Sequence, residues 1–97
     1  MIFSLWAAGN RAENAANFVT SHPRSVAADI KQISSLIKQA KANTRLAIAE
    51  KSLNQTKAQQ LSAMFTSMEE KGEITAEKQA LILLSNTLNK MVAVIEK

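Results

Sequence analysis

The sequence predicts an all-α protein: an elongated helical hairpin or coiled-coil bundle of three helices at about residues 4–20, 23–71 and 75–97. In 97 residues, only Gly9, Gly72 and Pro23 are of the types that break helices, against averages of about 7% Gly and about 5% Pro. Apolar residues make up 46% of the chain, many of them helix-favouring alanines. Their three- and four-residue spacing is that of amphipathic helices. Residues 1–97 are long enough for a single helical domain.

The first helix, over residues 4–20, is predicted from an apolar face that runs from Leu5 to Val19 at helical spacing. Pro23 separates it from the second helix, because proline disfavours the helical backbone at His22 and suits the first turn of a new helix.

The second helix is predicted to run unbroken over residues 23–71, since no Gly or Pro lies between Pro23 and Gly72. At 1.5 Å per residue this helix would be roughly 70 Å long. The alternative is an up-down four-helix bundle with a break near Asn43-Thr44. We prefer the continuous helix because no breaking residue is present. Its half-covered apolar stripes predict a homodimer.

The third helix, over residues 75–97, follows a predicted left-handed cap at Gly72 and takes Thr75 as its N-cap. Its apolar stripe is the clearest in the chain, and Leu83 makes it wider than a two-helix seam requires. A stripe this wide predicts more than one packing neighbour.

These stripes form the predicted partner-binding face, which we expect a helical partner protein or a second copy to cover. On the third helix the stripe is expected to meet apolar residues from the second half of the middle helix. The face comprises Val26, Ile30, Ile33, Ile37, Leu61, Phe65, Met68, Leu81, Leu84, Leu88, Met91 and Ile95.

Charge is concentrated in one window of the chain. The net charge of +4 lies entirely between Arg24 and Arg45, because acidic and basic residues balance on either side of that window. Four cations recur every seven residues, so a helix gathers them, with Lys41, on one side. This basic ridge consists of Arg24, Lys31, Lys38, Lys41 and Arg45. The ridge could keep the helix in solution, face an acidic protein surface or, as an alternative function, bind nucleic acid as a basic helical dimer.

Catalytic and metal-binding patterns are missing from the sequence. There is no cysteine, and His22 is the single histidine. The carboxylates around Gly72 lack the Asp-rich loop spacing of a calcium site. We therefore predict a protein that is not an enzyme and has no cofactor and no metal.

The expected function is a non-enzymatic protein-interaction module, an assembly component or chaperone-like adaptor. In composition alone, and in no motif, the chain resembles secretion-apparatus subunits and their chaperones, phage assembly factors and small inhibitors. No apolar run is long enough to span a membrane, and the apolar N-terminal segment lacks the basic residues of a signal peptide. We expect a soluble protein, cytoplasmic or exported without a classical signal peptide.

Overall fold

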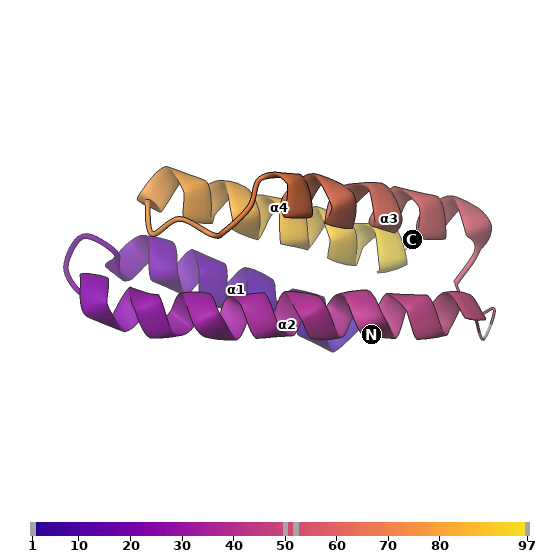
Figure 1. Cartoon of the computed structure of the whole chain (residues 1–97), viewed down its shortest axis with the longest axis horizontal. Helices are drawn as coiled ribbons and strands as arrows, with labels where there is room; N and C mark the ends of the chain where they lie inside the picture. Colours follow the sequence, from indigo (N-terminus) through magenta and orange to yellow (C-terminus); the bar gives the residue numbers. More distant parts are fainter. Residues whose placement is uncertain (1, 50, 52, 97) are drawn as a thin grey trace.

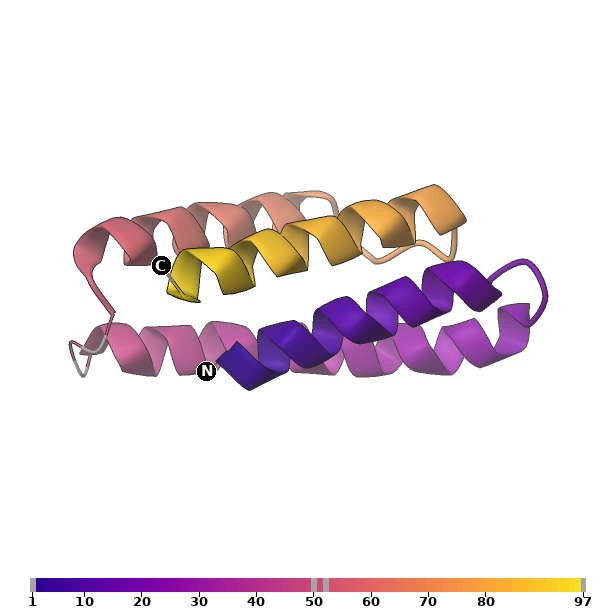
Figure 2. The ribbon, with the colours of Figure 1, turned by 180° about the vertical axis from the view of Figure 1, so that it is seen from behind.

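A computed structural model describes residues 2–49, 51 and 53–96, and in these ranges it contains four α-helices and no strand. The helices are α1 (Ile2–Phe18), α2 (Pro23–Ala49), α3 (Gln55–Glu70) and α4 (Lys78–Glu96). They run alternately up and down in a bundle whose extents are 44 × 22 × 17 Å (Figures 1 and 2). The predicted all-α class is confirmed. No described helix is both long and apolar enough to cross a membrane.

The predicted continuous helix over residues 23–71 is not formed, and the 70 Å hairpin with it. The chain turns back between Ala49 and Gln55, so the middle segment contributes two antiparallel helices. The alternative break near Asn43-Thr44 is also misplaced. Thr44 lies within α2, where its buried hydroxyl donates a 2.8 Å hydrogen bond to the carbonyl of Ala40.

Two residues that are not Gly or Pro mark this turn. Lys51 has a φ of 61°, the left-handed conformation that usually follows a helix as glycine, and its N–H donates to the carbonyl of Ile48 at 3.1 Å. Asn54 is the N-cap of α3, because its side-chain oxygen accepts a 2.8 Å hydrogen bond from the N–H of Lys57. A search for Gly and Pro therefore misses the turn.

The turn after α3 agrees with its prediction more closely. Gly72 has a φ of 78°, and its N–H donates to the carbonyl of Glu69 at 3.1 Å, as expected of a left-handed cap. The predicted N-cap at Thr75 is wrong by two residues. The first hydrogen bond of α4 runs instead from the N–H of Leu81 to the carbonyl of Glu77.

Helix α1 packs closely against both α2 and α4 because its buried face is made of small residues. Apart from Leu5, that face consists of Ser4, Ala8, Gly9, Ala12, Ala15 and Ala16. A Cβ added to Gly9 would lie 2.9 Å from Oδ1 of Asn89 and 3.6 Å from Cβ of Leu88. The hydroxyl of Ser85 donates a 3.1 Å hydrogen bond to the carbonyl of Gly9 in this contact.

Helix α3 packs on the opposite side of the bundle and brings larger side chains. Leu61 and Phe65 from α3 join Leu5, Leu88 and Met91 in the main buried cluster. A smaller cluster at the other end of α1 contains Val26 and Leu81 with two alanines. Side chains of this size hold helix axes farther apart than alanines do.

We predict that Gly9 tolerates alanine but not leucine. In Gly9→Ala the crowded atom is the end of the exposed Asn89 side chain, which can rotate away, and alanine gains about 1 kcal/mol of helix propensity. In Gly9→Leu the longer side chain meets α4 itself, and we expect the free energy of unfolding to fall by about 1–3 kcal/mol. Urea denaturation followed by circular dichroism measures both changes. Equal stability of the two variants would contradict the close contact between α1 and α4.

We also predict that Lys51→Gly stabilises the fold. The left-handed conformation costs a residue with a Cβ roughly 1 kcal/mol, which glycine avoids, so the free energy of unfolding should rise by about 0.5–1 kcal/mol. Lys71→Gly is the matched control, because Lys71 caps α3 in the right-handed conformation with a φ of −74°. A gain of the same size at both positions would show that the conformation of Lys51 is not its cause.

Candidate functional site

The structure buries much of the predicted partner-binding face inside the chain itself. Seven of its twelve residues are core residues: Val26, Ile33, Leu61, Phe65, Leu81, Leu88 and Met91. The other five are half-buried: Ile30, Ile37, Met68, Leu84 and Ile95. In the folded chain a partner can reach only these five, and not the continuous stripe from Val26 to Ile37.

The expected contact between the third predicted helix and the second half of the middle one is made by α4 and α3. Leu61, Phe65, Leu88 and Met91 share the main cluster, against which Met68, Leu84 and Ile95 pack. Leu81 lies instead with Val26 in the smaller cluster, beside Ile30. Leu81 therefore faces α1 and α2.

Three of the half-buried residues line a cavity beside α2. This central cavity has a volume of about 480 Å³ and lies where α3 ends and the chain crosses to α4. Ile37 lines it from α2, Phe65 and Met68 from α3, and Leu83 and Leu84 from α4. Figure 1 shows the connection between α3 and α4 running back alongside α2 at this place. The walls are mainly apolar.

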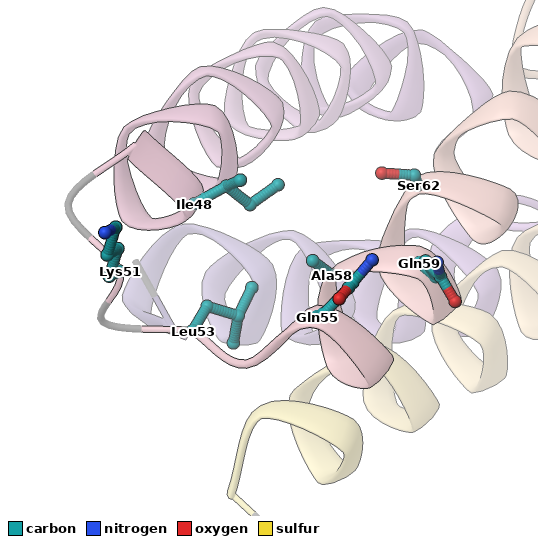
Figure 3. A pocket seen from close by; sticks show the side chains of 7 residues that line it. All are labelled: Ile48, Lys51, Leu53, Gln55, Ala58, Gln59 and Ser62. Carbon is teal, nitrogen blue, oxygen red and sulfur yellow. The ribbon is translucent and has the colours of Figure 1, made fainter.

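A second cavity lies farther along α2, where that helix ends and α3 begins. This terminal cavity has a volume of about 610 Å³. Figure 3 shows Ile48 extending into the opening from α2, with Ser62 facing it from α3 and the amides of Gln55 and Gln59 along one edge. Leu53 and Ala58 complete its apolar lining.

One stripe of α2 lines both cavities. Its residues are Ser34, Ile37, Lys38, Lys41 and Ile48, whose spacing places them along one side of a helix. We call this stripe, with the two cavities, the α2 groove. The eleven steps from Ile37 to Ile48 correspond to roughly 16 Å of helix.

The groove lies where α3 packs on the bundle. Helix α3 makes few close backbone contacts with either neighbour, α2 or α4, whereas α1 packs closely against both α2 and α4. The alanine face of α1 keeps its own contacts tight, while Phe65 and Met68 of α3 fill only part of the space facing α2. The apolar wall of the groove is therefore a consequence of unequal helix spacing.

The predicted basic ridge of α2 reaches the groove at two of its five residues. Arg24, Lys31, Lys38 and Arg45 are exposed on α2, and Lys38 and Lys41 line the central cavity. Lys41 crosses the cavity to pair with Glu69 of α3, the one ion pair between described residues. The other four cations of the ridge have no carboxylate partner in the described part of the chain.

Among the described residues, no catalytic site forms around His22. His22 is exposed beside Ser21, whose hydroxyl lies 2.9 Å from Nδ1 of the ring, and its own N–H caps the carbonyl of Phe18 at 2.7 Å. These are contacts of a helix end. Within the described ranges, no three His, Asp or Glu side chains gather as ligands for a metal ion.

Several groove residues were not predicted as part of a binding site. Ile48 and Leu53 surround the turn that the sequence prediction missed, and Ile74 lies in the connection after α3. The sequence did point to Leu83, because this residue makes the apolar stripe of the predicted third helix wider than contact with one neighbouring helix requires. The side chain of Leu83 remains 64% exposed.

Comparisons of the chain with protein-family models, with curated proteins and with solved structures gave no match.

We predict that the wall and the rim of the central cavity differ in their contribution to stability. Phe65 is 4% exposed, so Phe65→Ala should lower the free energy of unfolding by about 3–5 kcal/mol. Leu83→Ala on the exposed rim should change it by less than about 1 kcal/mol. Chemical denaturation of the two variants measures this difference. A large loss at Leu83 would mean that this side chain is a core residue and not a rim residue.

Proposed function

We propose that this chain is a non-enzymatic protein-interaction module, an assembly component or chaperone-like adaptor, that holds an amphipathic helix of a partner in the α2 groove. The observation that carries the proposal is the open central cavity, whose walls are the half-buried Ile37, Met68 and Leu84 and whose rim is the exposed Leu83. An apolar groove beside a helix is a common binding site for an amphipathic helix.

The dimensions of the groove support this occupant. Apolar side chains at positions i, i+4, i+7 and i+11 of a bound helix span roughly 16 Å, the same length as the α2 stripe from Ile37 to Ile48. The terminal cavity continues the groove, with glutamine amides on its edge that can donate to and accept from a partner backbone or side chain. A helix of about three to four turns fills this length.

The exposed area of the chain also supports an interface. A compact monomer of this mass exposes about 5,500 Å², whereas this chain of 10.6 kDa exposes 6337 Å². The difference, roughly 800 Å², is comparable to the surface that one partner contributes to a standard protein–protein interface.

A homodimer is one way to cover the groove and stays a prediction. Light scattering over a dilution series, with circular dichroism of the same samples, distinguishes a covering helix contributed by a second copy of this chain from one that belongs to another protein. A mass that doubles with concentration would identify the partner as a second copy. A helical monomer at every concentration leaves the groove for a helix of another protein.

We predict that Leu83→Gln weakens binding of an amphipathic helix and that Ile82→Gln does not. The two residues are neighbours on α4 and both are exposed, at 64% and 41%, but only Leu83 lines the central cavity. The probe is a fluorescently labelled helical peptide with leucine at the apolar positions of three heptads and glutamine elsewhere. Its anisotropy on titration with the full chain gives Kd, which Leu83→Gln should raise about tenfold because a buried leucine contributes about 1.5–3 kcal/mol.

Equal affinity of the two variants, or no binding of the peptide at all, would contradict the proposal. Circular dichroism of both variants checks that the substitutions leave the bundle folded. Neither residue is in the buried core, so both variants should keep the helicity of the original chain.

A further inference from the structure

The charge of this protein lies beside its groove. All of the net +4 comes from the window between Arg24 and Arg45, and that window lies within α2. Successive cations of the ridge at seven-residue steps are roughly 10.5 Å apart along the helix. The ridge and the groove side of α2 overlap between Ile37 and Arg45, where Lys38 and Lys41 belong to both.

The two surfaces meet at Lys38 and Lys41. Ile37 lines the central cavity, and Lys38 beside it both lines the cavity and belongs to the ridge. Lys41 lies in the cavity and is held by Glu69, so its charge is already balanced. Lys31, Lys38 and Arg45 are exposed on α2 and form no ion pair with a described carboxylate, and Glu73 lines the central cavity together with Lys38.

Building on the proposed function, we propose that the helix bound in the groove is acidic: an amphipathic helix of a partner protein with Asp or Glu at every seventh position on one flank of its apolar stripe. A heptad on the partner repeats at the same ~10.5 Å as the ridge, so its carboxylates can meet Lys38 and Arg45, the two heptad-spaced cations between Ile37 and Ile48. Charged flanks of this kind select partners and fix the register of paired helices.

The groove favours a helix over nucleic acid. A nucleic-acid backbone neutralises cations but leaves an adjoining apolar wall uncovered, and binding to single strands relies on exposed aromatic side chains on which bases stack. Phe65, the aromatic residue of the central cavity, is almost fully buried, and the other apolar residues of the lining are aliphatic or methionine, beside charged residues such as Lys38 and Glu73. An occupant therefore contacts both the apolar wall and the cations of the groove only when it is itself an amphipathic chain.

The ridge also disfavours a second copy at this face. In a two-fold pair the same surface is present on both subunits, so two grooves that face each other bring two basic ridges together. Like charges at an interface weaken association and suppress that pairing. An acidic helix of another protein meets the same ridge with the opposite sign.

The test compares three labelled peptides that share one leucine stripe over three heptads and differ only at one flanking position of each heptad, which is Glu, Gln or Lys. With the full chain at low salt, we expect the Glu peptide to bind about tenfold more tightly than the Gln peptide, and the Lys peptide to bind most weakly. The reason is that each exposed ion pair contributes a modest amount to the binding free energy. The advantage of the Glu peptide should shrink as salt rises.

The chain variant Lys38→Glu should remove most of the preference for the Glu peptide, whereas Lys90→Glu should keep it. Both positions are exposed and both changes alter the net charge equally, but Lys90 lies on α4 outside the groove lining. A preference that changes equally in the two variants would reflect net charge and would overturn the assignment to the ridge.

The outcomes separate the two proposals. If the Gln peptide binds, depends on Leu83 and shows the same affinity as the Glu peptide, the groove binds helices but the acidic partner is wrong. If no peptide binds in a Leu83-dependent way, the groove function itself is wrong. Displacement of the Glu peptide by duplex DNA with a steep salt dependence, or loss of peptide binding because the chain pairs with itself, would also overturn the acidic helix as occupant.

Discussion

The close approach of α1 and α4 sets the geometry of the whole bundle. Gly9 lets the two backbones come so near that a Cβ there would crowd Asn89, and the hydroxyl of Ser85 donates to the Gly9 carbonyl between them. The alanines on the buried side of α1 also allow close packing against α2. Helix α1 thus packs closely against both α2 and α4, whereas α3 has fewer close backbone contacts with its neighbours.

The groove follows from this unequal packing. Alanine buries little apolar area, so the larger part of the main core comes from Leu61 and Phe65 of α3 against Leu88 and Met91 of α4. Helix α3 has few close backbone contacts with either α4 or α2. Ile37, Met68 and Leu84 stay partly accessible in the central cavity.

The helical segments and their apolar stripes could be predicted from the sequence, but the neighbour against which each stripe packs could not. The cap at Gly72 was predictable because a left-handed residue there is a glycine. The turn at Lys51 was not predictable in this way, because a lysine stands where a left-handed cap is usually a glycine. This one turn makes two antiparallel helices of the middle segment. The width of the α4 stripe did indicate an additional neighbour, and Leu83 occupies that position at the groove.

Helix α2 presents three different surfaces. Val26 and Ile33 face the core, Ile37 and Ile48 face the groove, and the exposed cations form the outer edge. The groove and the ridge would each be ordinary alone, since half-buried apolar residues and solvated lysines occur on most helical proteins. Their overlap between Ile37 and Arg45 is the basis of the proposed occupant, because a ligand that contacts both surfaces must itself be apolar on one side and acidic on the next. An amphipathic helix has that arrangement at the same repeat as α2, since both follow the geometry of the α-helix.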